Sequence, residues 1–395
     1  MKVLVIHNSY QQPGGEDVVV SEESRLLESQ GHTVVRYERS NHEIERMSNT
    51  QRLLMVKDIV YSGESKREIG ELLFREKPEL VHVHNTFMMI SPSVYEACRE
   101  AKIPVLQTLH NFRLLCPGWN LCRGGKICEE CIETGLWRGV WHGCYRKSHV
   151  MTAAVALMLQ FHRMRGTWND SVDGYVALSE FARQKFIDSG LPAEKIHVKP
   201  NFVGHDPGVK KQAGKYALFV GRLSPEKGIE TLISAWGKMK ISIPLVIVGD
   251  GPLRKSLESE VASQYLSAVT FKGWLTREET LVSMKQAAFM VTPSVWYEGF
   301  PMSIAEAFAC GTPVLCSRLG GMREIVEDKR TGLHFNSGDA DDLARKVEWA
   351  WSQPDRMAEM GRAARKEYEV RYTAEKNYNT LMQIYEQTMR ACARN

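Results

Sequence analysis

The sequence predicts an α/β protein of two Rossmann-like, doubly wound domains that face a central cleft. The chain has 395 residues, more than a single hydrophobic core usually holds. Two successive series of short apolar runs, rich in Val and Ile, alternate with helical patterns, as expected for strands buried on both faces of parallel sheets. A polar stretch, Gly204–Gly214, separates the two series. We therefore expect domains at residues 1–203 and 204–370, and a C-terminal helix at 371–395 that packs back on the first domain.

The apolar runs predict the strands of each sheet. The first series predicts strands at Lys2–His7, His32–Tyr37, Leu80–His84, Pro104–Leu109, Gly174–Leu178 and Ile196–Lys199. The second series predicts strands at Tyr216–Val220, Pro244–Val248, Val269–Phe271, Ala288–Val291 and Pro313–Cys316. Open parallel sheets bind ligands beyond the carboxyl ends of their strands, so functional residues are expected at strand-to-helix turns.

Composition excludes several classes of protein. The formal charge is only +4 and no block of like charges occurs, so we expect no nucleic-acid partner. The longest apolar stretch, Val150–Phe161, is shorter than the roughly 20 residues that span a bilayer. The first apolar run ends at Asn8, too early for a signal peptide. We expect a cytoplasmic protein in a reducing compartment.

Two cations are predicted at the end of a strand. The segment Phe219–Gly228 passes from a strand, through a turn with two glycines, into a helix. Arg222 and Lys227 lie in that turn, where fixed positive charge could stabilise a departing diphosphate as a magnesium ion does in other enzymes. Taken alone, the motif is equally compatible with two solvated loop charges.

A second motif, Glu298–Ala307, predicts the start of a helix. Pro301 suits the first helical turn, so amides near Met302–Ile304 should point toward the predicted cleft and attract anions. Glu298 precedes this helix and Glu306 lies about one turn inside it. A carboxylate can accept hydrogen bonds from two neighbouring hydroxyls, which a sugar or a ribose offers.

Together, Gly-Arg-Leu-x-Pro-Glu-Lys-Gly and Glu-Gly-Phe-Pro-x-x-x-x-Glu-Ala resemble motifs of the retaining family-4 glycosyltransferases, which have the GT-B fold. The resemblance covers nearly the whole chain and is to the bacterial surface-polysaccharide type, including lipopolysaccharide assembly. It implies transfer of a hexosyl unit from a UDP- or GDP-sugar to a glycan or polyprenyl-linked acceptor with retention of anomeric configuration. Catalysis would need no metal or cofactor.

The resemblance also assigns roles to residues. Arg222 and Lys227 would hold the diphosphate, Glu306 the ribose, and Glu298 the transferred sugar, with the backbone of Gly299, Phe300 and Pro301. His110 would reach the sugar or the reacting centre, which makes His110, Glu298, Arg222 and Lys227 the candidate catalytic residues. The other candidate donor-binding residues are Gly14, Gly15, Gly221, Gly249, Asp250, Gly273, Trp274, Met302 and Ser303. The turns at Gly249 and Gly273 are equally compatible with ordinary βα turns, and His84–Asn85 is a candidate to face the acceptor.

No residue stands out as a general base, so the leaving phosphate is expected to take the acceptor proton. Two alternatives share the predicted architecture. One is a nucleotide-sugar epimerase, which needs the same diphosphate contacts, and the other is a non-catalytic nucleotide-sugar-binding scaffold.

Cysteines are concentrated in one insert, residues 116–144. Cys116, Cys128, Cys131 and Cys144 could form a four-thiolate structural zinc site, with Cys122 and His142 as substitute ligands. Free thiols are an equally open interpretation.

The following segment, Leu136–Trp168, mixes aromatic and basic residues. This pattern fits either a buried helix with a basic edge, the plainer interpretation, or peripheral association with the cytoplasmic face of the inner membrane, where a lipid-linked acceptor would be presented.

Overall fold

The computed structural model describes residues 1–11, 14–212 and 214–393; the predicted C-terminal helix at 371–395 thus has its last two positions, 394–395, outside the described residues. The chain divides into two compact units. The N-terminal unit comprises Met1–Leu121, Cys128–Gly204 and Asn377–Asn395, and the C-terminal unit comprises Cys122–Ile127 and His205–Lys376.

The N-terminal unit is built on a parallel sheet in the order β2-β1-β3-β4-β7-β8. Its strands are β1 (Lys2–Ser9), β2 (Thr33–Ser40), β3 (Leu80–Asn85), β4 (Val105–Leu109), β7 (Gly174–Ala177) and β8 (Ile196–Val198). Its helices are α1 (Gly15–Ser29), η1 (Asn41–Arg46), α2 (Asn49–Val60), α3 (Gly63–Glu76), α4 (Ser93–Glu100), α5 (Glu130–Glu133), α6 (Trp137–Trp141), α7 (His149–Met164), α8 (Thr167–Asp170), α9 (Glu180–Asp188), η2 (Ala193–Lys195) and most of α17 (Ala374–Cys392). All six runs predicted as strands form strands. Strands β1, β3, β4 and β7 are buried along most or all of their length, whereas the edge strands β2 and β8 are partly exposed.

The C-terminal unit is built on a second parallel sheet in the order β11-β10-β9-β12-β13-β14. Its strands are β9 (Ala217–Val220), β10 (Leu245–Val248), β11 (Val269–Gly273), β12 (Phe289–Thr292), β13 (Val314–Ser317) and β14 (Gly332–Phe335). Its helices are η3 (Pro225–Lys227), α10 (Ile229–Lys238), α11 (Arg254–Ser263), α12 (Arg277–Gln286), α13 (Met302–Ala309), α14 (Met322–Ile325), α15 (Ala340–Ser352) and α16 (Pro354–Arg371). A two-stranded hairpin, β5 (Cys122–Arg123) with β6 (Lys126–Ile127), groups with this unit.

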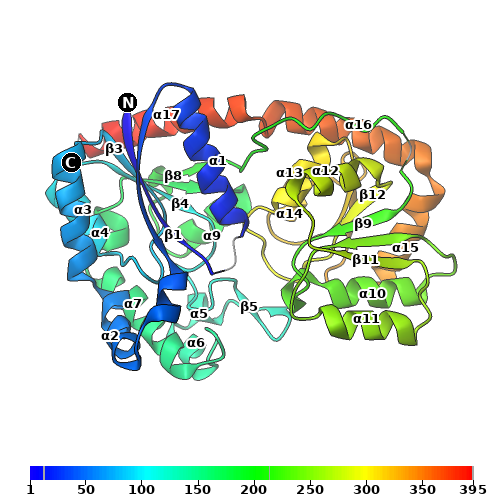
Figure 1. The fold of residues 1–395 in the computed structure, drawn as a ribbon, viewed down its shortest axis with the longest axis horizontal. Helices are drawn as coiled ribbons and strands as arrows, with labels where there is room; N and C mark the ends of the chain where they lie inside the picture. The colour runs from blue at the N-terminus through cyan, green and yellow to red at the C-terminus, as the bar shows by residue number, and fades with distance from the viewer. Residues whose placement is uncertain (12–13, 213, 394–395) are drawn as a thin grey trace. The chain divides into compact units, whose positions relative to one another are not determined.

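Helices cover both faces of the second sheet. In Figure 1, α10 and α11 lie on one face, whereas α12 and α13 lie on the other. The core on the α10 side is apolar throughout and includes Phe219, Ile233 and Trp236. Buried apolar area of this kind contributes about 25 cal/mol per Å² to folding, so the sheet is a rigid platform for the loops at its edge.

Strand order locates the place in each sheet where a ligand can bind. In the second sheet, the chain adds strands outward in one direction from β9 and in the other direction from β12, so the strand order reverses between these two strands. In the first sheet, the strand order reverses between β1 and β3. At such a switch point the loops from adjacent strands leave toward opposite faces and open a crevice beyond the strand ends. The loops that follow β9 and β12 are therefore the first place to look for a site in the C-terminal unit.

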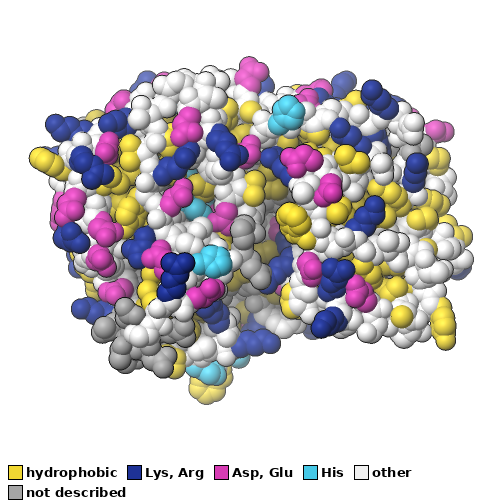
Figure 2. Space-filling view, viewed as in Figure 1, with side chains coloured by type: hydrophobic (Ala, Val, Ile, Leu, Met, Phe, Trp, Pro, Cys, Tyr) yellow, Lys and Arg dark blue, Asp and Glu magenta, His cyan; other side chains and the backbone are white. Residues whose placement is uncertain are grey.

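No helix among the described residues is long and apolar enough to cross a membrane. On the face shown in Figure 2, basic and acidic side chains are intermingled.

Candidate functional site

The loops after β9 and β12 are packed together and linked by a backbone hydrogen bond. The Val295 amide donates to the Glu226 carbonyl oxygen at 3.0 Å. Gly228 has φ +68°, and a Cβ there would lie 1.9 Å from the Pro293 carbonyl oxygen. Only glycine fits this position, so the sequence Glu-Lys-Gly is needed for the two loops to approach.

This approach brings two of the predicted residues into direct contact. Lys227 Nζ donates to Glu298 Oε1 at 2.7 Å and to Oε2 at 3.0 Å. The Ser294 hydroxyl donates to Glu298 Oε1 at 2.6 Å. Glu298 is only 6% exposed, so its carboxylate is held by both partners. Lys227 Nζ also lies 5.4 Å from the centre of the Trp296 ring, in a cation–π contact.

Arg222 lies on the same loop after β9 and is exposed. Its neighbour Gly221 is packed against the next loop, because a Cβ on Gly249 would lie 1.9 Å from the Gly221 carbonyl oxygen. Gly249 has φ +134°, a conformation that requires glycine. The Leu223 amide donates to the Asp250 carbonyl oxygen at 2.9 Å, so the loops after β9 and β10 form one continuous rim.

The rim continues to the end of β11. The Gly249 amide donates to the Gly273 carbonyl oxygen at 2.8 Å. Trp274, which follows, is 73% exposed. Asp250 accepts from the Gly251 amide and from Arg254, and these hydrogen bonds hold the pKa of its carboxyl below the usual value.

Helix α13 begins at Met302, directly after Pro301. The first-turn amides of a helix have no partner within it, and they carry the positive end of its dipole. Met302 and Ser303, at this terminus, are partly exposed, whereas Phe300 is buried, with its ring centroid 5.6 Å from that of Tyr372. Glu306 lies one turn further along and accepts from Arg277 Nε at 3.3 Å.

In the N-terminal unit, Gly14 and Gly15 form the start of helix α1. The Gly14 amide donates to Asp17 Oδ2 at 2.7 Å, and the other carboxylate oxygen of Asp17 lies 2.8 Å from His7 Nε2. Neither glycine has a positive φ. A Cβ on Gly14 would meet one atom within 4 Å, Asp17 Oδ2 at 3.9 Å, so packing among the described residues does not require glycine there.

Glu16 carries a perturbed carboxyl group beside these glycines. Burial, followed by the nearby Asp17 carboxylate, raises its pKa to about 7, although His7 and a hydrogen bond from Tyr10 oppose the shift. The Tyr10 hydroxyl donates to Glu16 Oε2 at 3.1 Å. Glu16 therefore changes charge close to neutral pH.

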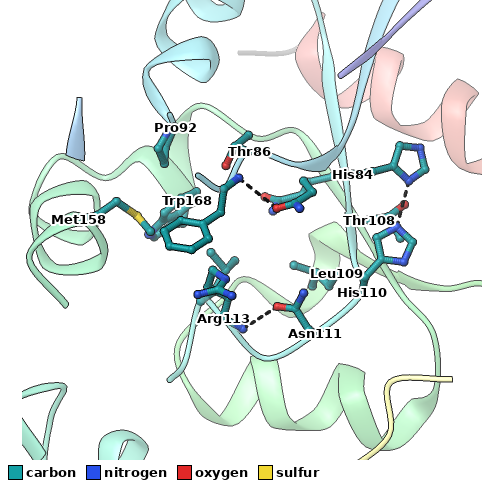
Figure 3. Close-up of a pocket in the computed structure, with 14 residues that line it drawn as sticks. His84, Thr86, Pro92, Thr108, Leu109, His110, Asn111, Arg113, Met158 and Trp168 are labelled. Carbon is teal, nitrogen blue, oxygen red and sulfur yellow. Dashed lines mark hydrogen bonds between the residues drawn. The ribbon is translucent and has the colours of Figure 1, made fainter. Parts of the chain in front are cut away.

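His110 follows β4 and contacts His84 on the neighbouring strand β3. Figure 3 shows the two rings side by side, with His84 Nδ1 3.0 Å from His110 Nε2. Both line a small cavity of about 40 Å³, room for a few water molecules, whose other end reaches Met158 and Trp168.

His84 and Asn85, the candidates to face an acceptor, are both largely buried and both line this cavity, so that role stays a prediction. Asn85 Nδ2 donates to the Asn8 carbonyl oxygen at 2.8 Å, and Asn85 Oδ1 accepts from the Phe87 amide at 3.0 Å. Asn85 therefore fixes the turn after β3, and His84 supports His110.

Several buried polar residues were missed from the sequence. His7, Glu23, His82 and Lys199 all lie in the layer beneath His110. Two of them could have been found from their position, because His7 lies in the carboxyl-terminal part of β1 and Lys199 directly follows β8, where open sheets place functional groups. His82 lies within β3 and gave no such signal.

Three cysteines of the insert lie near one another in the N-terminal unit. A Cβ on Gly118 would lie 3.5 Å from Cys116 Sγ and 3.4 Å from Cys144 Cβ. A hydrogen bond from Cys131, followed by bonds from the Gly118 and Leu121 amides, lowers the pKa of the Cys116 thiol to about 7, although burial opposes the shift. Among the described residues, the one group of three potential metal ligands within 4.8 Å of each other is Glu23, His82 and His84.

Comparison with known proteins identifies the family. Residues 13–206 match the profile described as Glycosyltransferase Family 4, and residues 205–367 match the profile described as Glycosyl transferases group 1. An uncharacterised glycosyltransferase of Methanocaldococcus jannaschii is 31% identical over 291 residues, which cover 72% of this chain and 69% of that protein. The chain is a family-4-like GT-B glycosyltransferase.

Other relatives are matched over less of their length. A second uncharacterised glycosyltransferase of the same archaeon is 32% identical over 172 residues, 44% of this chain and 48% of that protein. The match thus spans about half the length of that relative. Among solved structures, HepE of Anabaena in complex with UDP has a TM-score of 0.69 at 17% identity, covering 97% of this glycosyltransferase and 99% of that chain. The prediction of two α/β domains, each built on a parallel sheet, is confirmed by the strand order and by this similarity of fold.

Proposed function

We propose that this glycosyltransferase transfers a hexosyl unit from a UDP- or GDP-sugar to a glycan or polyprenyl-linked acceptor, with retention, in the assembly of a cell-surface polysaccharide. The observation that carries the proposal is the contact between Lys227 and Glu298 at the switch point of the second sheet, with Arg222 on the same loop. HepE, which shares the fold, has been solved with UDP and with UDP-glucose, and this supports the donor class.

Charge placement accounts for donor activation. As the sugar departs, negative charge grows on the diphosphate, and the Lys227 ammonium and the Arg222 guanidinium stabilise it together with the amide end of α13. Glu306 accepts hydrogen bonds from the ribose. Glu298 anchors Lys227 and accepts from sugar hydroxyls with its remaining lone pairs.

The reaction balances without a further reactant. The acceptor oxygen forms a bond to the anomeric carbon while the bond from that carbon to the diphosphate oxygen breaks. The acceptor proton passes to the leaving diphosphate, which departs from the same face that the acceptor attacks. Attack occurs on the face from which the diphosphate leaves, which retains the configuration. Since Arg222 and Lys227 supply the positive charge, we propose that turnover needs no divalent cation.

In the N-terminal unit, the candidate substrate contacts are Gly14 and His110. Packing among the described residues does not require glycine at position 14, and we propose that Gly14 lets the backbone approach a sugar or a phosphate closely. His110 is partly buried and its Nε2 contacts His84, and we propose that its other ring nitrogen, Nδ1, contacts the substrate.

A thermal-shift panel of UDP-, GDP- and ADP-sugars tests the donor, since a ligand bound only by the folded state raises Tm. Turnover assays with glycan and polyprenyl-linked acceptors follow with the donor that binds. Product formed only when an acceptor is present supports the proposal. An altered donor formed without acceptor would identify an epimerase, and binding without turnover would identify a scaffold.

We also propose that the N-terminal unit binds the surface of an anionic membrane, where a polyprenyl-linked acceptor resides. Residues 135–169 contain no Asp or Glu but five Arg or Lys residues. Trp137 and Trp141 share one exposed face of α6, and Val150, Leu157 and Met164 are exposed at seven-residue intervals on α7. Wild type should pellet with vesicles of phosphatidylglycerol at low salt, and Trp141→Ser with Leu157→Ser should not. Failure of wild type to pellet would overturn this proposal.

For the insert we propose a structural zinc ion bound by Cys116, Cys128, Cys131 and Cys144. The support is the convergence of Cys116, Cys131 and Cys144 and the backbone amides directed at the Cys116 sulfur. Metal analysis of protein purified without chelator should find about one zinc per chain. Clearly less than one zinc per chain would show that these cysteines are free thiols.

A further inference from the structure

A buried chain of polar side chains runs beneath His110 in the N-terminal unit. His84 Nδ1 contacts His110 Nε2 at 3.0 Å, and His84 Nε2 lies 3.8 Å from Glu23 Oε1. Lys199 Nζ donates to the other carboxylate oxygen of Glu23 at 2.6 Å. The side chains of Lys199 and Glu23 are only 2% and 3% exposed, so this ion pair is sealed from water.

The cluster is not arranged to bind a metal, although Glu23, His82 and His84 are close enough together. Both ring nitrogens of His82 have partners, the Tyr385 hydroxyl at 2.9 Å and the Thr108 hydroxyl at 2.8 Å. The Lys199 ammonium already compensates the Glu23 carboxylate and would repel a cation. The cluster therefore needs another explanation.

The imidazoles are neutral at physiological pH. Burial, followed by the other histidines and Lys199, holds the pKa values of His84 and His110 well below the usual value, and burial lowers that of His82 to about 4. Each ring therefore carries one proton. A single proton lies between His84 Nδ1 and His110 Nε2, and one of the two nitrogens must be the acceptor.

Glu23 decides which nitrogen accepts. Its Oε1 is buried without a hydrogen-bond partner. It lies 3.5 Å from His82 Nδ1, which already contacts the Tyr385 hydroxyl, and 3.8 Å from His84 Nε2. A proton on His84 Nε2 places a positive dipole toward this oxygen, whereas the other tautomer would turn a lone pair toward a buried carboxylate. With its proton on Nε2, His84 accepts at Nδ1. His110 then donates from Nε2, and its Nδ1 is left unprotonated.

We propose that Glu23, acting through His84, holds His110 in the tautomer whose Nδ1 accepts a hydrogen bond from a substrate hydroxyl. The proposal rests on the proposed function for the role of His110 as a substrate contact. Glu23, His84 and Lys199 are then positioning residues. The titratable groups that face the two rings are His7, Glu23, His82 and Lys199, and Tyr385 contacts His82.

Nitrogen-15 spectra of histidine-labelled protein read the tautomer directly and without substrate. Wild type should show His110 protonated on Nε2 and bare on Nδ1, with the signals assigned from His110→Gln. In Glu23→Gln the side-chain oxygen is retained by Lys199, so the amide group donates to His84 Nε2 and both histidines adopt the opposite tautomer. This should lower kcat about 100-fold or more with little change in KM. Glu28→Gln, on the exposed side of α1 and 2.7 Å from Arg36, should change neither quantity.

A proton on His110 Nδ1 in wild type would overturn the proposal, and so would an unchanged His110 tautomer in a folded Glu23→Gln variant. If that variant does not fold, because Lys199 has lost its counter-charge, the wild-type spectrum decides alone. Failure of the proposed function would look different, since it would appear as no donor binding and no transfer by wild type whatever the tautomer.

Discussion

Lys227→Met is the substitution that most sharply separates a role in donor activation from a role in stability. It keeps the length and apolar stem of the side chain and removes the ammonium group. Glu298 would retain the hydroxyl of Ser294 at 2.6 Å but lose its cation at 2.7 Å.

The two expected effects differ in size. Removing one partner of a fully buried ion pair costs about 3–5 kcal/mol, but the Lys227 side chain is 26% exposed, so we expect about 1–2 kcal/mol. For a unit of this size that lowers Tm by about 2–8 °C. Loss of a group that stabilises charge in the transition state should lower kcat about 100- to 1000-fold.

Initial rates with the donor found by thermal shift, together with Tm by calorimetry, measure both effects on the same protein. Lys238→Met is the matched control, because Lys238 pairs with Asp341 at 2.8 Å on the exposed surface of the same unit. The control should keep Tm and rate nearly unchanged. If Lys227→Met retains kcat/KM within about threefold of wild type, Lys227 does not act on the diphosphate.

Three further predictions follow from the geometry. Glu16→Gln should stabilise the protein above pH 7 by up to about 3 kcal/mol and have little effect below pH 4.5, because a pKa raised to about 7 makes the ionised form of Glu16 unfavourable in the folded state. Urea unfolding of the variant and wild type at several pH values measures this difference. Equal effects of the substitution at pH 4 and pH 8 would contradict the prediction. His82 should contribute a loss of stability as pH falls from about 6.5 toward 4, since its imidazole takes a proton more readily in the unfolded chain. The stability of His82→Gln relative to wild type should therefore increase over this range in urea unfolding, and a difference that does not change with pH would refute the argument. Gly249→Ala should lower the free energy of unfolding by more than about 3 kcal/mol, because the new Cβ would meet the Gly221 carbonyl oxygen. Gly338 also has a positive φ but has open space around it, so Gly338→Ala should lower the free energy of unfolding by only about 1 kcal/mol. Similar unfolding midpoints for the two variants would show that the loops after β9 and β10 are not held together.

The fold was largely predictable, because strands buried on both faces of a parallel sheet leave a strong apolar pattern. In the two parallel sheets, the strand that was not predicted from the sequence is β14, Gly332–Phe335, which begins with glycine and contains His334. Its register beside β13 requires that glycine, since a Cβ there would lie 1.9 Å from the Val314 carbonyl oxygen. The glycine that this close backbone packing requires lowers the strand propensity of the segment, so the sequence pattern did not predict the strand.

The site was predictable as motifs but not as contacts. Lys227 and Glu298 are 71 residues apart, and their contact depends on β9 and β12 being neighbours. Strand order is set by tertiary packing, which apolar periodicity along one segment does not contain. Glu23 and Lys199 were not predicted for a related reason. They lie 176 positions apart, and the sequence does not show that these two charged residues form a buried ion pair in the folded chain.

Calorimetric titration of the nucleoside diphosphate that raises Tm most, with its monophosphate as comparison, tests the central claim most directly. If Arg222 and Lys227 hold the second phosphate, wild type should bind the diphosphate at least about tenfold more tightly than the monophosphate, and Lys227→Met should lose that preference. A variant that keeps the full preference would contradict the placement of the diphosphate at this rim.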